Sequence, residues 1–206
     1  MLPLMRTVIL TMLGISILAG CASPPIRSDY SQDMQPLREG KHLDKVWFDE
    51  GLLKVNHYSE VQLGIVQGLG ISNQTNITID EAVRWLREAT LSPGADAVVL
   101  STGGQGQIAT LELVITELNP GSTAARFWAG EFGAGHAWVQ VEGKLIDANN
   151  HKLLAYFVER DRKSGVATLR NSRGYDSGPG LIHDIIEDIG RKIKQEIETM
   201  LYVQVR

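Results

Sequence analysis

Cysteine is almost missing from this chain of 206 residues, which has a single one, Cys21. A lone thiol excludes an intrachain disulfide and a thiolate metal cluster, so the fold must be stabilised by packing. Long hydrophobic runs are missing too. The most apolar stretch, residues 8–18 (VILTMLGISIL), has 11 residues, whereas a membrane-spanning helix needs roughly 20. We therefore expect no permanent transmembrane helix.

An excess of positive charge is also absent, because the formal net charge is −4. Mild acidity is unfavourable for binding nucleic acid, so we predict no nucleic-acid partner. The chain lacks the H-E-x-x-H and G-x-S-x-G motifs, and none of its five histidines lies four residues from another. These absences predict a protein that is not an enzyme and that has no metal site and no cofactor.

The amino terminus has the order of an export signal. Arg6 is followed by the apolar residues 8–18, and small residues then precede Cys21. A buried core helix is the alternative, but it does not account for this order. Residues 18–21 (LAGC) resemble the lipobox of bacterial lipoproteins. The resemblance implies cleavage after residue 20 and attachment of palmitate-type acyl chains to Cys21, which would anchor the mature chain in a membrane.

The residue after the cysteine predicts the compartment. In the sorting rule of lipoproteins an aspartate there retains the protein in the inner membrane, whereas this chain has Ala22 and then Ser23. The resemblance therefore implies an outer-membrane anchor facing the periplasm. In a host with one membrane, the same signal implies its outer surface.

Composition divides the chain into three parts. Residues 22–40 are polar, contain three prolines and show no periodicity, which is typical of a disordered tether. The remainder is long enough for one domain with a core. The predicted parts are a signal peptide (1–20), the lipidated Cys21 with a tether (21–44) and a single periplasmic α/β domain (45–206).

The first half of the domain is predicted to begin with strands and a helix. Residues 46–61 favour one or two strands with a bend at Gly51. The glycines at 64, 68 and 70 indicate a flexible connector rather than a phosphate cradle, because no Gly-Lys-Ser/Thr follows them. Thr78 and Glu81 form a capping box, which predicts a helix ending near residue 91.

The second half is predicted to contain two hairpins and a final helix. Residues 95–100 and 108–118 form one predicted hairpin, and 137–146 with 153–158 form the other. A polar loop at 159–177 follows, with a short strand at 166–169. A helix starting at Pro179 buries an apolar stripe, made by Leu181, Ile182, Ile185, Ile186, Ile189, Ile193, Ile197 and Leu201.

These elements predict an α/β class, an α+β sandwich. We expect a mostly antiparallel sheet of about five strands packed against two helices, in the order β-α-β-β-β-β-α.

The most distinctive stretch, residues 119–147, has a glycine-rich turn before a strand. It resembles an uncharacterised family of bacterial lipoproteins, the domain of unknown function 4410 type, over residues 45–200. That family usually closes its last turn with Thr-Gly, where this chain has Asn150 and His151. Because the family has no settled activity, it implies no catalytic residues. The matching residues are Arg126, Gly130, Phe132, Gly133, Ala134, Gly135 and Asp147.

This stretch also supplies the candidate interaction or ligand site. Glycines in such a turn can form an anion nest, although a purely structural tight turn is the alternative. His136 could act chemically beside Glu131 or simply be exposed, and Asp147 could be a general base or cap its own turn. The candidate turn comprises Arg126, Gly130, Gly133, Gly135, His136 and Asp147.

The leading functional hypothesis is a non-enzymatic interaction module that binds an envelope protein. Its surface would be a sheet edge, or the glycine turn together with the loop 159–177. One alternative is a small-ligand binder or enzyme in which Arg126, Glu131, His136 and Asp147 converge on one pocket. Another is an oligomeric component of an envelope assembly.

Overall fold

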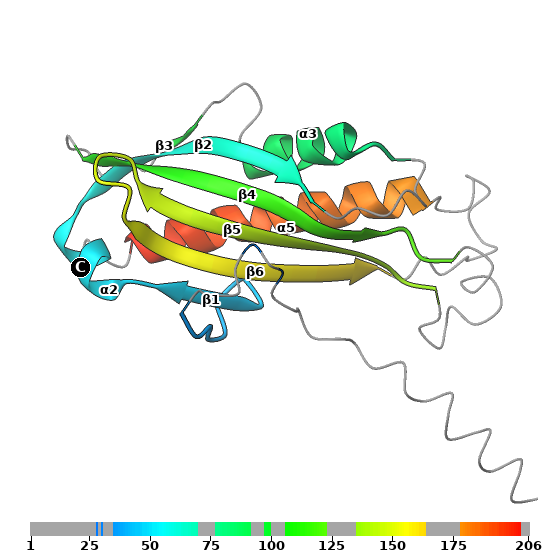
Figure 1. Ribbon diagram of the computed structural model, residues 1–206, viewed down its shortest axis with the longest axis horizontal. Coiled ribbons are helices and arrows are strands. Elements are labelled where there is room, and N and C mark those ends of the chain that lie inside the picture. The colour runs from blue at the N-terminus through cyan, green and yellow to red at the C-terminus, as the bar shows by residue number, and fades with distance from the viewer. Residues whose placement is uncertain are drawn as a thin grey trace, which may run out of the picture.

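The computed structural model describes a sheet with its two long helices on one face (Figure 1). The described residues are 28, 30, 35–69, 77–91, 97–99, 106–122, 135–163 and 178–202. The elements are β1 Lys45–Phe48, α2 Glu50–Val55, β2 Tyr58–Gly68, α3 Ile79–Thr90, β3 Ala97–Val99, β4 Gln107–Asn119, β5 Ala137–Asp147, β6 Leu153–Lys163 and α5 Gly178–Tyr202. The predicted class and order are confirmed, and the short α2 occupies the bend predicted at Gly51.

The sheet order is β1-β6-β5-β4-β2-β3, and only the β2–β4 pair is parallel among the described strands. The predicted hairpin of residues 137–158 is confirmed by the antiparallel β5–β6 pair. The predicted hairpin of residues 95–100 and 108–118 is wrong, because β2 lies between β3 and β4. Alternation of apolar residues identifies a strand but not its neighbour, and β2 pairs with β3 on one side and with β4 on the other.

The glycines at 64 and 68 lie inside β2 and not in a connector, which corrects the sequence prediction. A Cβ atom at Gly64 would lie 2.7 Å from Thr110 Cγ2 of β4. Glycine therefore lets the two parallel strands approach closely, beside a register shift between Leu63 and Val66. Gly70 lies outside the described residues.

Helices α3 and α5 cover the same face of the sheet (Figure 1). The predicted capping box is present: Thr78 Oγ1 accepts from the Glu81 amide at 3.2 Å, and Glu81 Oε2 accepts from the Thr78 amide at 2.9 Å. The two helices pack closely because Gly190 has no side chain; a Cβ there would lie 2.5 Å from Ala89 Cβ.

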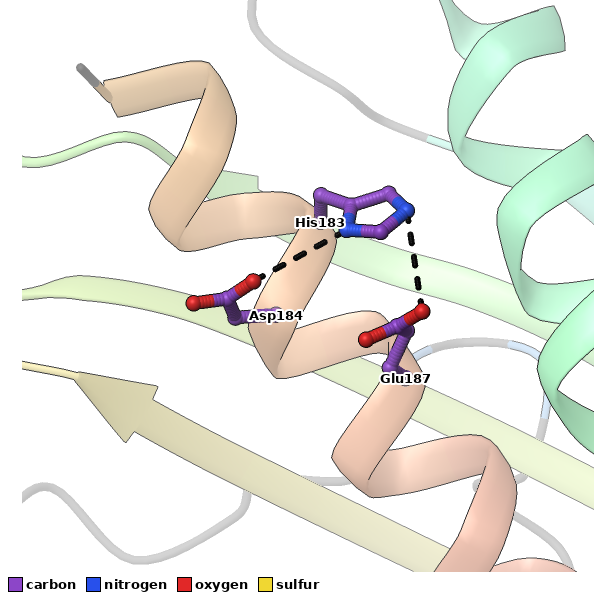
Figure 2. A group of neighbouring side chains, drawn as sticks. All are labelled: His183, Asp184 and Glu187. Carbon is purple, nitrogen blue, oxygen red and sulfur yellow. Dashed lines mark ion pairs between the residues drawn. The ribbon is translucent and has the colours of Figure 1, made fainter. Parts of the chain in front are cut away.

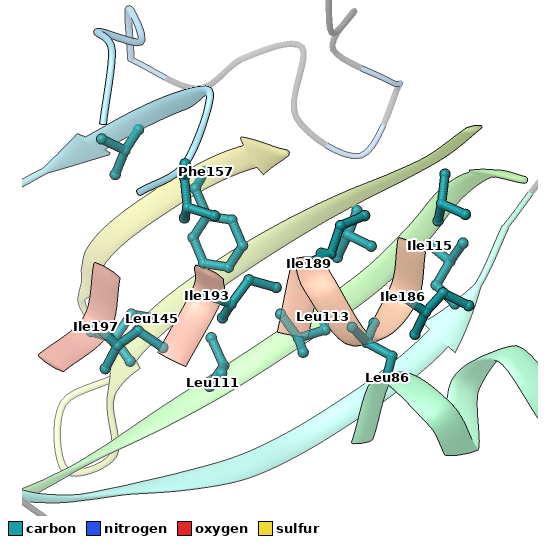
Figure 3. Close-up of a cluster of buried hydrophobic side chains, with 14 of the residues drawn as sticks. Leu86, Leu111, Leu113, Ile115, Leu145, Phe157, Ile186, Ile189, Ile193 and Ile197 are labelled. Carbon is teal, nitrogen blue, oxygen red and sulfur yellow. The ribbon is translucent and has the colours of Figure 1, made fainter. Parts of the chain in front are cut away.

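The hydrophobic core lies between the helices and this face of the sheet. In Figure 3, the isoleucines of α5 face Leu111 and Leu113 of β4, Leu145 of β5 and Phe157 of β6. Every residue of the predicted α5 stripe is buried. A helix stripe with a period near four thus packs against alternate strand residues, as the sequence predicts.

Strand β6 extends into the predicted loop, up to Lys163. Its last residues are held to α5 by ion pairs: Lys192 Nζ lies 2.6 Å from Glu159 Oε1 and 3.0 Å from Asp161 Oδ2, and Lys163 Nζ lies 2.7 Å from Asp188 Oδ2. In the sequence these charged residues resemble a polar loop, but in the structure they form ion pairs between β6 and α5. The rest of the predicted loop and its short strand lie outside the described residues.

The segment before β1 packs on the body, so the domain begins earlier than the predicted residue 45. Arg38 exchanges two backbone hydrogen bonds with Val46, at 2.9 and 2.7 Å, and Leu43 is only 3% exposed. The Glu196 carboxylate on α5 accepts the amides of Lys41 and His42 at 3.3 and 2.5 Å. Predicted tether residues from 38 onward therefore belong to the folded body.

No helix in the described part of the chain is long and apolar enough to cross a membrane.

Candidate functional site

Half of the candidate turn predicted from sequence lies outside the described residues. Arg126, Gly130 and Gly133 fall there, as do Glu131 and the lipid-attachment residue Cys21. The described members of the candidate turn are Gly135, His136 and Asp147.

Gly135 and His136 lie in a turn that contacts the end of β4. Gly121 and Gly135 have φ angles of 67° and 74°, the left-handed region that favours glycine. A Cβ on Gly121 would lie 2.2 Å from the Gly135 carbonyl oxygen, so the two turns touch. The His136 Nδ1 atom is enclosed without a hydrogen-bond partner among the described residues. Burial, and next the positive charge of Arg162, lower the pKa of His136.

Asp147 caps the turn between β5 and β6. Its Oδ1 accepts the amides of Asn149 and Asn150 at 2.8 and 3.3 Å, and its Oδ2 accepts from Tyr58 Oη at 2.9 Å. Burial alone would raise the pKa of Asp147, but these hydrogen bonds outweigh it and lower the pKa. The two amide bonds hold the turn, which supports the capping interpretation, and the Tyr58 bond ties the turn to the start of β2.

His136 and Asp147 lie at opposite ends of β5. His136 immediately precedes the strand and Asp147 is its last residue, so eleven residue steps separate them by roughly 36 Å at 3.3 Å per residue. One pocket cannot contain both side chains. A site that uses all four residues of the enzyme or ligand alternative is therefore excluded.

A cluster of His183, Asp184 and Glu187 on α5 was not singled out in the sequence. The His183 nitrogens lie 3.8 Å from Asp184 Oδ1 and 3.8 Å from Glu187 Oε1 (Figure 2). The carboxylate side chains are 57% and 59% exposed, and the His183 ring packs edge-on against Trp85, with centroids 4.9 Å apart. The geometry is that of solvated side chains on a helix surface, in which His183 and Glu187 lie one turn apart and Asp184 is the next residue after His183.

Buried polar side chains occupy the face of the sheet opposite the helices. We call Gln140, Glu142 and Tyr156 the outer-face cluster; each is at most 1% exposed. Glu142 accepts hydrogen bonds from Tyr156 Oη at 2.5 Å and Gln140 Nε2 at 3.3 Å. It also accepts the backbone amide of Ser28 at 2.9 Å. The chain just after the predicted signal is thus held on this face.

A neighbouring aromatic contact strengthens this attachment. Lys144 Nζ lies 3.8 Å from the centre of the Tyr30 ring, a cation–π contact. Burial, and then the carboxylates of Glu112 and Glu142, raise the pKa of Tyr30 to about 12. The alternation Val139-Gln140-Val141-Glu142 could have signalled a polar outer face, but nothing in the sequence identifies Ser28 as its partner.

Among the described residues, only part of the outer side of β2 is paired with a strand, and we call the remainder of that side the open edge. Strand β3 pairs with β2 only at Glu60, Val61 and Gln62, although β2 continues to Gly68. Beyond Gln62, no described strand pairs with the outer side of β2. Two large apolar residues are exposed there, Ile65 at 59% and Leu69 at 45%.

The backbone direction at this edge follows from one hydrogen bond. Leu69 donates its amide to the Ile115 carbonyl of β4 at 2.8 Å. Since the backbone groups of successive strand residues point to opposite sides, those of Gly68 and Val66 point away from β4. The open edge therefore presents backbone donors and acceptors together with apolar side chains.

Comparison with known families gives one match. The model of a family described as "Domain of unknown function (DUF4410)" matches residues 80–168, which run from α3 through β6. This confirms the resemblance predicted from the glycine turn and its following hairpin. No curated protein matches the chain.

Several solved structures are similar to this one. A candidate lipoprotein from Caulobacter crescentus has 13% identity and a TM-score of 0.38, covering 75% of this chain and 98% of its own. The PelC dodecamer from Paraburkholderia phytofirmans has 13% identity and a TM-score of 0.35, covering 64% and 86%. The hypothetical protein CT253 from Chlamydia trachomatis has 12% identity and a TM-score of 0.37, covering 68% and 99%. At such values these similarities establish neither a function nor an assembly for this chain.

Proposed function

We propose that this chain, whose residues 80–168 match the DUF4410 family, is a lipid-anchored envelope protein that binds an extended segment of a partner protein. The lipobox-like residues 18–21 support an anchor at Cys21. The residue after Cys21 is Ala22 and not aspartate, which supports the outer membrane and a periplasmic body. The partner's segment binds at the open edge of β2, and no chemical reaction is involved.

The open edge is the observation that carries this proposal. An extended peptide can add to an exposed strand through backbone hydrogen bonds, with alternate side chains providing specificity. The unpaired part of β2, from Leu63 to Gly68, spans about 20 Å. Proteins usually protect such an edge with lysine, proline or a covering segment; here β2 has instead the exposed Ile65.

The charged side chains buried in the body support a role without catalysis. The Asp147 carboxylate caps a turn, Glu159 pairs with Lys192, and Glu196 holds the segment before β1. Each buried acid therefore has a structural task. In the described part of the chain, no nucleophile is paired with a general base inside a cleft.

The binding edge can be tested by crosslinking in cells. A photoreactive amino acid at Ile65 should crosslink one defined envelope protein, which mass spectrometry identifies. Val66→Pro removes an outward N–H and should abolish the crosslink, since proline is tolerated at an edge whose amide faces solvent. Val66→Thr keeps the amide and is the matched control.

Two results would contradict the proposal, and a third would call for another variant. If the crosslink persists in Val66→Pro, the edge does not bind the partner. If the crosslinked mass is that of two copies of this chain, the oligomeric alternative is favoured. If Val66→Pro shifts the thermal unfolding midpoint, the variant has damaged the fold and an Ile65→Lys variant replaces it, with loss of the crosslink from a probe at Leu69 as the expected result.

The anchor is tested separately by fractionation and mass spectrometry. The native protein should have an acylated Cys21 at its amino terminus and occur in outer-membrane fractions. The Cys21→Ser variant should lose both properties. An unmodified, soluble native protein would refute the anchor and leave the edge to be tested on its own.

A further inference from the structure

Helix α3 lies beside the open edge of β2. It packs on β2, whereas α5 packs mainly on β5 and β6 (Figure 1). Neighbouring helices are about 8–10 Å apart and neighbouring strands about 4.8 Å apart. With α5 over β5 and β6, α3 therefore lies over the β2 side of the sheet, and one flank of α3 extends past the open edge. A strand added to β2 would lie along this flank.

The contacts of α3 identify the residues on this flank. Trp85 and Ala89 lie against α5, and Leu86 is fully buried. Successive residues of a helix are rotated by about 100°. Relative to Leu86, the two residues that face α5 are therefore about 60° to 100° to one side, and Val83 and Arg87 are about 60° and 100° to the other side. Val83 and Arg87 thus face the open edge.

This flank has two apolar side chains followed by a cation. Ile79, Val83 and Arg87 follow one another at intervals of four residues, which places them in one row along α3. Ile79 is 41% exposed, Val83 is partly buried at the margin of the core, and Arg87 is exposed. A ligand on this row meets an apolar surface first and a positive charge at its end.

Arg87 has no acidic neighbour at helical spacing. The residues three and four positions away along α3 are Val83, Arg84, Thr90 and Leu91. In the described part of the chain, no residue forms an ion pair with Arg87. Arg84 differs in this respect, because hydrogen bonds from Thr78 and then the charge of Arg84 lower the pKa of Glu81. The charge of Arg87 is therefore available to an acidic group of a ligand.

The open edge of β2 is itself uncharged. Residues 61–69 (VQLGIVQGL) contain no acidic or basic side chain. Leu63 and Val66 pack against the core, so Gln67, the residue after Val66, points to the opposite face of the sheet. The charge that distinguishes one bound segment from another therefore lies on α3 and not on β2.

The spacing of the row on α3 matches that of an extended segment. Helical residues four apart are separated by about 6 Å along the axis, and alternate residues of a strand by about 6.6 Å. Because α3 runs along β2 (Figure 1), a strand bound at the open edge would place alternate side chains opposite Val83 and Arg87.

We propose that the segment bound at the open edge has an acidic residue two positions from an apolar residue. The carboxylate pairs with Arg87, the apolar side chain covers Val83, and the residue between them faces away from α3. Backbone hydrogen bonds to β2 hold the segment, whereas this pair of side chains selects its sequence. The inference rests on the proposed function, since it names the chemistry of the partner's segment.

A peptide library tests this preference on the purified full chain. Random dodecapeptides are displayed on phage and selected on the native chain, and those that also bind Val66→Pro are removed. The remaining peptides should be enriched in aspartate or glutamate two positions from a large apolar residue. A fluorescent peptide with this pattern should bind about tenfold more tightly than the same peptide with lysine in place of the acid, because the charge contact is reversed.

Substitutions on α3 provide the matched comparison. Arg87→Glu should reverse the preference, so that the lysine peptide binds more tightly than the acidic one. Arg87→Gln should weaken binding of the acidic peptide about threefold, as expected when one exposed charge pair is lost. Arg84→Gln removes an equal charge about 160° from Leu86, on the side away from the sheet, so binding should not change. Thermal unfolding checks that each variant folds, and Arg87→Gln replaces Arg87→Glu if the latter does not.

The outcomes separate this inference from the proposed function. If the native chain selects no peptide that Val66→Pro fails to bind, the open edge does not bind extended segments and both proposals are wrong. If such peptides are selected without an acidic preference, or if Arg87→Gln and Arg84→Gln weaken binding equally, the edge remains a binding site but Arg87 does not select its ligand. A reversed preference in Arg87→Glu together with unchanged binding to Arg84→Gln supports the inference.

Discussion

The contact between Gly143 and Phe157 provides a sharp test of the core. The two residues are direct partners across β5 and β6 and both are buried; the Phe157 ring lies on the face covered by α5 (Figure 3). A Cβ at Gly143 would lie 2.1, 2.6 and 2.7 Å from three atoms of the Phe157 ring. The ring thus lies flat over the glycine and takes the place of its side chain.

The magnitude follows from these distances. Carbon atoms are most favourably placed about 3.5–4.0 Å apart, so Gly143→Ala forces the ring or the strand to move by more than 1 Å. In a packed core this costs about 1–3 kcal/mol or more. Urea unfolding of the two proteins should therefore give a lower midpoint for Gly143→Ala with an unchanged slope.

A second substitution distinguishes the clash from a general intolerance of alanine. In a Phe157→Leu background the ring is gone, so Gly143→Ala should cost less than about 0.5 kcal/mol, and the two changes should be strongly non-additive. Gly51→Ala in α2 is the control, because its Cβ would meet only an Asp49 carboxylate oxygen at 3.2 Å. Additive effects, or a Gly143→Ala protein as stable as the native one, would refute the reasoning.

Three further predictions concern buried polar groups and a helix end. Lys192→Met should destabilise the fold by about 3 kcal/mol because Glu159 remains buried without its cation. Adding Glu159→Gln should restore most of the lost stability, and urea unfolding measures both effects. If the double variant is no more stable than Lys192→Met, the ion pair does not have this role. Because folding lowers the pKa of Asp147 below its ordinary value of 3.8, the stabilisation by its carboxylate is present above that value and is lost as the pH falls through the folded pKa. Asp147→Asn should therefore be less stable at pH 7, with a difference that shrinks in acid; a difference independent of pH would argue against it. Thr78→Ala should lower the free energy of unfolding by about 1 kcal/mol, as measured by thermal unfolding. If Glu81→Ala destabilises the fold but Thr78→Ala does not, the Thr78 side chain is not the cap.

Local chemistry made the helices and one hairpin predictable. Thr78 and Glu81 define the start of α3 through two reciprocal hydrogen bonds within four residues, and the α5 stripe is a periodicity of its own sequence. The hairpin of β5 and β6 joins adjacent strands through a short turn, which Asp147 caps. Each of these features is encoded within about 25 neighbouring residues.

The remaining features depend on contacts between distant residues. The parallel pairing of β2 with β4 brings Gly64 against Thr110, and no local pattern distinguishes that close approach from a connector. Gly143 lies within the predicted strand at 137–146, and no local pattern indicates that the Phe157 ring packs over it. The position of the segment before β1 likewise depends on Glu196, which lies more than 150 residues away in the chain. Single-sequence periodicity carries no information on such partners.

The hydrogen bond from Ser28 to Glu142 changes how far the proposed anchor lets the body travel. If the tether ran from Cys21 to the first strand at Lys45, it would be 24 residues long. Because Ser28 is held on the sheet, the tether is only seven residues long, which is at most about 25 Å when fully extended. That is shorter than strand β4, whose 13 residues span about 43 Å. An anchored body would therefore lie against the bilayer and not explore the periplasm. It would meet its partners as in a two-dimensional search, at a high effective concentration for any other protein held to the same membrane.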